Sequence, residues 1–540
     1  MNFRGVVRLL GFVCLLVGTA MMFSIPWGLT VCGGDWSVEQ RGVYGLLLSV
    51  GVSFLLGLTF LLAGRHAKIQ LFRKEAMAVV GLSWILVTLL GALPYLLSGV
   101  ERAKDIRMNV FDAMFESQSG FSTTGSTTLS ELENRSMVPR CLLFWRSSTQ
   151  FLGGLGIIVF MVAILGHGTF AKSVFRAERS GPPGQNSSQT RVQKLAWTLL
   201  FLYLVFNVIL TLILQLEGLP FFDAVCHAFT TIATGGFSTF NASAGHFITA
   251  EGYNGPLIEW TLIIFMFLGG TNFILFYGCF RGNFKQLFTD MEWRTYVVMI
   301  VLATLIVFAA GYWHHDFDYY GTSGNPIMVD ADGHPPETDP HVSYGFRNSC
   351  FQVVSLITST GFCTDEFERW NAVSCAMLLI VMFTGACSGS TAGGTKLIRC
   401  ILSFKLITHE VERSYRPNVV RNVWLQGEMV DRDLLVNVAV FVLIYMTILC
   451  FGTLAVTIAE PDNTWLLAGN TIENKLTDSF GAVLTCLSND GPGLGIVGAR
   501  QNFGQLTSVS KFLLTWIMMI GRLEIFGILA LFSPSFWKSH

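Results

Sequence analysis

Long apolar runs alternate with short polar connections along the whole chain, and this alternation predicts its secondary structure. A helix needs about 20 predominantly apolar residues to cross the hydrocarbon core of a bilayer. Ten segments meet that requirement, the eighth of them long and interrupted: Leu9–Val31, Val43–Gly64, Ala76–Ser98, Leu142–Gly166, Leu195–Leu216, Leu257–Phe280, Thr295–Tyr312, Ala372–Thr408, Leu434–Ile458 and Val509–Phe532. We therefore expect a polytopic membrane protein of the all-α class.

The composition agrees with a location in lipid. Of 540 residues, 52% are hydrophobic and only 13% are charged, whereas soluble proteins carry about 25% charged residues. The formal net charge of −1 leaves no basic face for phosphates, which argues against nucleic acid as a partner. The twelve cysteines are scattered and form no C-x-x-C pair, so neither a zinc site nor a redox motif is indicated.

Four shorter apolar stretches lie between the predicted spans and are too short to cross a bilayer. Each begins with Asp or Asn and reaches a glycine 13 positions later. They are Asp112–Thr124, Asp223–Gly235, Asn348–Thr360 and Asp478–Asp490, and the glycines are Gly125, Gly236, Gly361 and Gly491. Four matches at one offset indicate an internal repeat of outer helix, re-entrant helix and inner helix. The implied units are a two-helix extension, 1–70, and four repeats, 71–170, 171–290, 291–412 and 413–540.

The predicted helix after each short stretch carries polar groups at membrane depth, where such groups normally face a bundle interior or a watery path. These groups are Arg146 and Gln150, Glu259 and Asn272, the Ser388–Lys396 stretch, and Arg522 with Glu524. The helix before each stretch is almost purely apolar, so the inner helices are expected to surround a central pathway.

The distribution of basic residues predicts the orientation. The connection 65–74 holds four Lys or Arg, 167–194 holds five and 396–432 holds seven, whereas 238–256 holds none. The basic connections are therefore expected in the cytoplasm together with both termini. The re-entrant stretches, and the acidic connection 313–347, then lie on the outer side.

The end of each short stretch has the chemistry of a cation filter. An Asp or Asn cap suits the first turn of a re-entrant helix, and the negative end of its dipole would point to mid-membrane. Small residues and glycine let an extended backbone aim its carbonyls inward, and rings of four carbonyls can replace the water shell of a monovalent cation. The candidate ion-binding residues are Thr123, Thr124, Gly125, Thr234, Gly235, Gly236, Ser359, Thr360, Gly361, Asn489, Asp490 and Gly491.

Four motifs in this chain resemble one known family. They are SGFSTTGST (119–127), FWRSSTQFLGGLGIIV (144–159), GACSGSTAGGTKLIR (385–399) and GRLEIF (521–526). The chain is similar to the Trk/Ktr/HKT superfamily of potassium transporters, and closest to its bacterial TrkH-type subunits, over essentially its whole length. The resemblance implies potassium uptake across the bacterial cytoplasmic membrane by a homodimer. It also implies a cytoplasmic nucleotide-binding regulatory partner of the TrkA type, with K⁺ as the transported ion and no organic cofactor in this chain.

The same resemblance assigns roles to individual residues. It makes the four glycines the filter, and because serine at the first of these positions goes with sodium transport in related plant proteins, Gly125 favours potassium. Asp490 departs from the Thr/Ser pattern of the other stretches. The resemblance further implies an electrostatic barrier at Arg522, near the middle of the last inner helix, with a buried pair to Glu524 as the alternative. It implies an intramembrane gating loop, with a kinked helix as the alternative, that contains Gly385, Ser388, Gly389, Gly393, Gly394 and Lys396.

Two other classes of function compete with a potassium pore. Gly385–Gly389 resembles a nucleophile elbow, so a membrane enzyme using Cys387 is one alternative, although no α/β sheet is predicted to carry it. A coupled secondary transporter with inverted repeats is the other. Passive flux and flux coupled to protons or sodium are both compatible with the sequence.

Overall fold

The fold is helical almost throughout, which confirms the predicted class. The computed structural model describes residues 2–29, 35–66, 73–165, 188–250, 252–317, 341–416, 422–426, 428–467, 471–523 and 525–537. Within these ranges the only sheets are two short antiparallel hairpins. One pairs β1 (Glu101–Ala103) with β2 (Ile106–Arg107), and the other pairs β3 (Trp424–Leu425) with β4 (Glu428–Met429).

Among the described residues, six helices are long and apolar enough to cross a membrane. They are α1 (Phe3–Met22), α2 (Trp36–Ala63), α3 (Arg73–Ser98), α7 (Ser188–Leu216), α13 (Met291–Trp313) and α17 (Arg432–Ala459). A further helix, α5 (Arg140–Leu165), is 26 residues long. These helices correspond to seven of the ten predicted spans.

The other three predicted spans are interrupted. Leu257–Phe280 does not form one continuous helix, because α10 (Gly255–Gly270) and α11 (Phe273–Phe280) meet at 96°. The break follows from Asn272, whose side chain accepts a hydrogen bond from the Ile274 amide (2.9 Å) and starts a new helix. The eighth span is broken, as predicted, into α15 (Ala372–Thr384) and α16 (Leu397–Tyr415).

The last span also differs from its prediction. Val509–Phe532 is not one helix, because α20 (Ser508–Arg522) ends at Arg522 and is followed by the short helices α21 (Phe526–Leu529) and α22 (Pro534–Trp537). Arg522 is therefore the last residue of its helix and not near the middle. The small helices α9 (His246–Thr249), α12 (Phe284–Thr289) and α18 (Asn463–Leu467) lie in connections.

The four short stretches form helices that end at the Thr/Ser/Gly positions. These are α4 (Val110–Phe121), α8 (Phe221–Ile232), α14 (His341–Ile357) and α19 (Lys475–Ser488). The expectation that the leading Asp or Asn caps each helix is wrong, because the helices begin earlier. In α4, Asn109 is the cap, and Asp112 completes a capping box by accepting from the Asn109 amide (3.1 Å).

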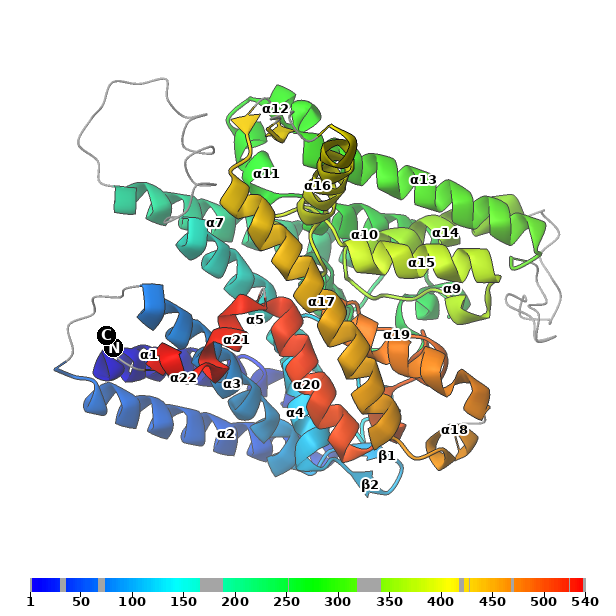
Figure 1. Ribbon diagram of the computed structural model, residues 1–540. Helices are drawn as coiled ribbons and strands as arrows, with labels where there is room; N and C mark the ends of the chain where they lie inside the picture. Colours follow the sequence, from blue (N-terminus) through cyan, green and yellow to red (C-terminus); the bar gives the residue numbers. More distant parts are fainter. Residues whose placement is uncertain are drawn as a thin grey trace.

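The first and last described helices lie side by side at one end of the molecule (Figure 1). The rings of Phe3 in α1 and Trp537 in α22 stack with centroids 6.3 Å apart. The two ends of the described chain therefore lie on the same side of the helix bundle. There α22 lies beside α1, which packs with α2 and α3 (Figure 1).

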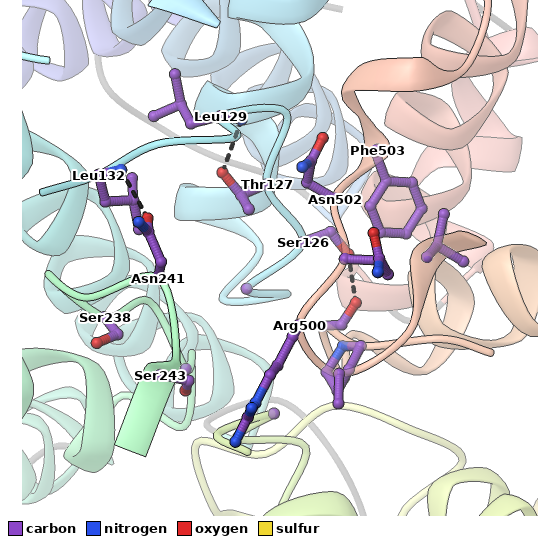
Figure 2. A pocket seen from close by; sticks show the side chains of 18 of the residues that line it. Ser126, Thr127, Leu129, Leu132, Ser238, Asn241, Ser243, Arg500, Asn502 and Phe503 are labelled. Atoms are coloured by element: carbon purple, nitrogen blue, oxygen red, sulfur yellow. Dashed lines mark hydrogen bonds between the residues drawn. The ribbon is translucent and has the colours of Figure 1, made fainter. Parts of the chain in front are cut away.

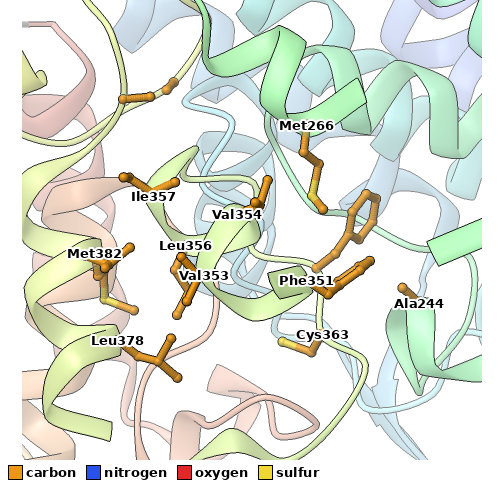
Figure 3. Close-up of a cluster of buried hydrophobic side chains, with 14 of the residues drawn as sticks. Ala244, Met266, Phe351, Val353, Val354, Leu356, Ile357, Cys363, Leu378 and Met382 are labelled. Carbon is orange, nitrogen blue, oxygen red and sulfur yellow. The ribbon is translucent and has the colours of Figure 1, made fainter. Parts of the chain in front are cut away.

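The short helix α14 is enclosed by neighbouring helices on several sides (Figure 3). Its Phe351 and Leu356 are fully buried, and they belong to a cluster that includes Met266 of α10 and Leu378 and Met382 of α15. In lipid such contacts stabilise by close packing, because the surrounding tails are as apolar as the side chains. The short helix α14 is thus a core element, and its packing fixes where its C-terminal end points.

A buried ion pair joins α20 to α4. Lys511 of α20 contacts Asp112 of α4 at 2.5 Å, both side chains are fully buried, and the Lys511 ammonium also donates to the Gly504 carbonyl (2.9 Å). Breaking such a pair by removing one partner costs about 3–5 kcal/mol, because the other charge stays buried. We expect Lys511→Met to lower the melting temperature by several degrees, measured by intrinsic fluorescence in detergent.

The double variant Lys511→Met/Asp112→Asn provides the control for that prediction. It removes both charges, so it is expected to recover most of the lost stability. Equal melting temperatures for the single and double variants would show that the interaction between Lys511 and Asp112 does not contribute to stability.

Candidate functional site: four glycine segments around one axis

Four segments at the ends of the short helices share one backbone conformation. We call them the glycine segments: Thr123–Gly125, Thr234–Gly236, Ser359–Gly361 and Asn489–Gly491. The first residue of each is left-handed, with φ of 51°, 53°, 50° and 60°, and the glycines have φ of 86°, 73°, 78° and 93°. Left-handed backbone is costly for residues with a Cβ, so its recurrence at matched positions indicates a constrained geometry.

The middle residue of each segment is held in the same way. Its amide donates to the carbonyl of the residue five positions earlier, at the end of the short helix. The four bonds are Thr124 to Ser119 (2.8 Å), Gly235 to Thr230 (2.8 Å), Thr360 to Ser355 (2.8 Å) and Asp490 to Thr485 (3.0 Å). Each segment therefore leaves its helix by an equivalent turn.

The four glycines form a closed ring. A Cβ added to Gly125 would collide with the Gly235 carbonyl oxygen, one on Gly236 with that of Thr360, and one on Gly361 with that of Asp490. A Cβ on Gly491 would lie 2.8 Å from the carbonyl oxygen of Thr124, which returns to the first segment. Each glycine thus packs on the neighbouring segment, and the four segments surround one axis.

An open pocket ends on this ring. All four glycines line it, together with hydroxyl and amide groups such as Ser126, Thr127 and Asn241 (Figure 2). The Arg500 side chain extends across the pocket and donates to the carbonyl of Thr364 (3.5 Å), three residues after Gly361. The pocket is the polar approach to the ring from one side.

Polar side chains of α5 hold the ring from behind. Arg146 pairs with Glu116 (2.7 Å), which also accepts from the hydroxyl of Thr127 (2.9 Å) just beyond the first segment. Gln150 brackets the second segment by donating to the Gly235 carbonyl (2.5 Å) and accepting from the Phe237 amide (3.1 Å). Arg146 and Gln150 are buried, as their membrane depth predicted.

The fourth segment differs from the others in its side chains. Asn489 donates to the Thr124 hydroxyl (2.9 Å) and to the Met518 carbonyl (3.1 Å), so it joins the first glycine segment to α20. The Asp490 carboxylate is fully buried and, among the described residues, has no hydrogen-bond partner. Asp490 contributes its carbonyl to the ring, next to Gly361.

The loop between α15 and α16, residues 385–396, lies against two of the glycine segments and the end of α8. Its Thr391 hydroxyl donates to the Ile232 carbonyl at the end of α8 (3.0 Å), and the Gly393 amide donates to the Ser359 hydroxyl. A Cβ on Gly393 would meet the Ser488 carbonyl and the Asn489 side chain. The predicted break is therefore a loop packed against the ends of the short helices and not a simple kink.

The remaining predicted loop residues have distinct roles in its conformation. Left-handed backbone occurs at Gly385 (68°), Gly389 (74°), Gly394 (73°) and Lys396 (66°). The Lys396 ammonium donates to the Ala392 carbonyl (2.7 Å) and so binds the loop itself.

Arg522 lies close to the same region. Its side chain is 3% exposed, and no group in the described ranges forms a hydrogen bond with its guanidinium. The guanidinium is within electrostatic range of the Tyr203 hydroxyl on α7. Close packing fixes the backbone position of Arg522, because a Cβ on the preceding Gly521 would collide with the Leu487 carbonyl oxygen. Glu524, the partner considered from the sequence, lies outside the described residues.

Sequence reasoning missed Glu292, which contacts the loop. It accepts hydrogen bonds from the Ser388 amide and hydroxyl, both at 2.6 Å. The signal was present, because Glu292 lies three residues before the predicted span Thr295–Tyr312. Its target, a loop 96 residues away, could not be read from spacing.

A carboxylate outside the spans makes part of the pocket wall sensitive to pH. Glu368 accepts from the Ala499 amide (3.2 Å), and burial raises its pKa from 4.5 to about 7. Between those values the folded state binds more protons than the unfolded state, so stability falls as pH rises. We expect the melting temperature of Glu368→Gln to exceed that of the unchanged protein at pH 8. The difference should disappear at pH 5, and a constant difference would contradict this assignment.

Comparison with known proteins identifies the family once this geometry is established. A model of the TrkH family, described as a cation transport protein, matches residues 49–539. This chain belongs to the TrkH family. The matched range contains all four glycine segments, the 385–396 loop and Arg522.

Relatives of the TrkH family match the chain from end to end. It is 32% identical over 544 residues to the Trk system potassium uptake protein TrkH of Salmonella typhimurium, and 31% identical to that of Halomonas elongata, with 100% of both chains covered in each case. The crystal structure of the potassium transporter TrkH from Vibrio parahaemolyticus superposes with a TM-score of 0.80 at 28% identity, again over 100% of both chains.

TrkH-family membership decides between transport and enzymatic function. The relatives are transport proteins and not enzymes, so the alternative of a membrane enzyme using Cys387 is wrong. Cys387 is fully buried in the loop, where its amide donates to the Gly270 carbonyl (3.1 Å). Its small apolar side chain serves packing.

Proposed function

We propose that this TrkH-family protein takes up potassium through a channel-like pore whose filter is the glycine ring. The closed contact of each glycine with the next segment carries the proposal, because it leaves four backbone carbonyls around one axis. Such a ring can replace the hydration shell of a cation without any charged ligand. The names of the relatives, potassium uptake proteins of the Trk system, supply the ion.

The filter residues are the twelve of the glycine segments, and K⁺ is their ligand. Glycine at all four ring positions lets the backbone adopt left-handed dihedrals without a side chain entering the pore. The presence of Gly125 at the first position supports potassium over sodium. Asp490 acts through its carbonyl, and its carboxylate stays behind the ring.

The gate is the 385–396 loop together with Arg522. Irregular backbone at membrane depth is tolerated where it is buried in protein or lines a water-filled cavity, and the contacts of Gly393 support a position directly below the ring. The positive charge of the Arg522 guanidinium would repel a permeating cation at that point. The two elements control passage after the ion leaves the filter.

The protein is oriented with both ends in the cytoplasm of a bacterial cell and with the pocket of Figure 2 facing outward. The basic connections support this orientation. We place the four repeats at 71–170, 171–290, 291–412 and 413–540 after the extension 1–70. The matched dihedrals of the glycine segments support this division.

The proposed assembly is a homodimer bound to a cytoplasmic nucleotide-binding partner of the TrkA type. The relatives' names describe a Trk system, which supports additional components. On the cytoplasmic side α16 exposes an apolar stripe at helical spacing, Phe404, Ile407, Val411 and Tyr415, suited to another protein surface. The basic segments 172–194 and 396–432 are the candidate docking surfaces for this partner, and the side chains of 172–194 lie outside the described residues.

Rubidium-86 uptake into liposomes that contain the purified protein tests the function. Trapped potassium should drive uptake, whereas trapped sodium should not, and protein-free vesicles supply the background. Uptake that requires an imposed proton gradient would assign coupled transport instead of passive flux. Absence of uptake under every gradient would overturn the proposed pore.

A further inference from the structure

Glu292 is a buried carboxylate in the first turn of α13, and it contacts Ser388 in the 385–396 loop and Ile398 in the first turn of α16. Its side chain is 6% exposed. One oxygen accepts from the amides of Ser388 (2.6 Å) and Ile398 (3.2 Å), and the other accepts from the Ser388 hydroxyl (2.6 Å). Hydrogen bonds to a carboxylate in its ionised form are stronger than bonds between neutral groups.

The two targets lie on opposite sides of the loop. Ser388 is near its beginning, and Ile398 is in the first turn of α16, beyond its end. The residue at the start of α16, Lys396, provides no side-chain cap, so the first amides of that helix need an acceptor from elsewhere. Glu292 supplies one from a separate helix and closes the loop at its base.

We propose that Glu292 is a latch, a positioning residue whose carboxylate holds the 385–396 loop against the filter in the closed conformation. The inference rests on the proposed function, because it takes the loop as the gate. When the Ser388 and Ile398 amides leave this carboxylate, the base of the loop opens and the Gly393 contact with Ser359 is no longer held in place.

The latch is positioned where cytoplasmic elements act on it. Two residues before it, Asp290 accepts from the side chain of Gln426, in the turn of the β3–β4 hairpin (2.7 Å). Lys405 of α16 donates to the Trp424 carbonyl of the same hairpin (2.6 Å). The hairpin, α16 and the start of α13 therefore meet close to α12 (Figure 1). A partner that shifts the hairpin or α16 changes the geometry of the latch directly.

Glu292→Gln tests the latch in the purified full-length protein without any partner. The amide keeps the size of the side chain but removes the charge from all three hydrogen bonds. We expect about tenfold faster rubidium uptake, a typical size for coupling between sites. We also expect about tenfold faster alkylation of Cys387, the buried neighbour of Ser388, by N-ethylmaleimide, measured by peptide mass spectrometry. Cys226, buried in α8, is the internal reference and should react at an unchanged rate.

Two further variants make the result specific. Glu217→Gln also converts a hydrogen-bonded carboxylate to an amide, at a bond to Thr261 (2.6 Å) outside the loop, and should leave uptake unchanged. Ser388→Ala should raise uptake on its own, and adding it to Glu292→Gln should have less effect than the two changes summed. It also serves as the second test if Glu292→Gln does not fold.

The outcomes separate the latch from the proposed function. Absence of potassium-driven uptake in the unchanged protein would overturn the proposed function. Normal uptake in the unchanged protein, with equal or slower uptake and unchanged Cys387 alkylation in Glu292→Gln, would overturn the latch alone. Additive effects of the two substitutions would also overturn it.

Discussion

Gly361→Ala is expected to abolish potassium-selective uptake. The added Cβ would collide with the Asp490 carbonyl oxygen and approach the Pro492 ring at 2.9 Å. Neither neighbour is a flexible side chain, so the third and fourth segments must separate. The left-handed backbone, with φ of 78°, adds a strain of roughly 1–2 kcal/mol for a residue with a Cβ. Rubidium uptake driven by trapped potassium should fall at least about tenfold, because even 1.4 kcal/mol of lost coordination suffices for that factor.

A matched control separates backbone strain from the collision. Gly282 has a comparable φ of 84°, but nothing lies within 4 Å of an added Cβ. Gly282→Ala therefore carries similar strain away from the ring, and uptake should be close to normal. If both variants lost uptake equally, strain alone would account for the effect and the ring contact would not be the cause.

Arg522→Ala is expected to raise uptake strongly. No described group forms a hydrogen bond with the guanidinium, so its charge acts on whatever passes nearby. Two unit charges about 8 Å apart in a medium with an effective dielectric constant of about 20 repel by roughly 2 kcal/mol. Removing that barrier corresponds to roughly a 10- to 30-fold faster flux if passage below the filter limits the rate. Rubidium uptake by liposomes is the measurement.

Arg522→Lys tests whether charge or shape produces the barrier. Lysine keeps the positive charge but not the planar guanidinium, so uptake should stay within about threefold of the unchanged protein if the electrostatic account holds. Fast uptake in both variants would assign the effect to packing at the end of α20. Slow uptake in Arg522→Ala, with a normal melting temperature, would show that Arg522 is no barrier.

Much of the fold could be predicted, because membrane spans and internal repeats leave strong local patterns. Seven of the spans follow from apolar length alone. The glycine offset located the Thr/Ser/Gly segments, whose matched dihedrals the chain adopts. The polar pair Arg146 and Gln150 was correctly expected in the interior.

The rest depended on contacts that a linear pattern does not carry. The break at Asn272 looks like any polar residue in a span until its side chain is seen to cap α11. The leading Asp112 looked like a cap, but the helix begins at Val110 with Asn109 as its cap, so Asp112 is free to pair with Lys511. The role of Glu292 required knowing which loop folds back onto α13.

The fourth glycine segment shows that four segments of a single chain can carry different side chains at matching positions. In a ring of four identical subunits, every side chain next to the axis is repeated, so one buried aspartate would bring four carboxylates together at considerable electrostatic cost. Here Asp490 occurs once, opposite Thr124, Gly235 and Thr360 at the matching positions. Joining the four quarters in one polypeptide frees each quarter to diverge. Asymmetry becomes available around an axis whose backbone geometry stays nearly fourfold.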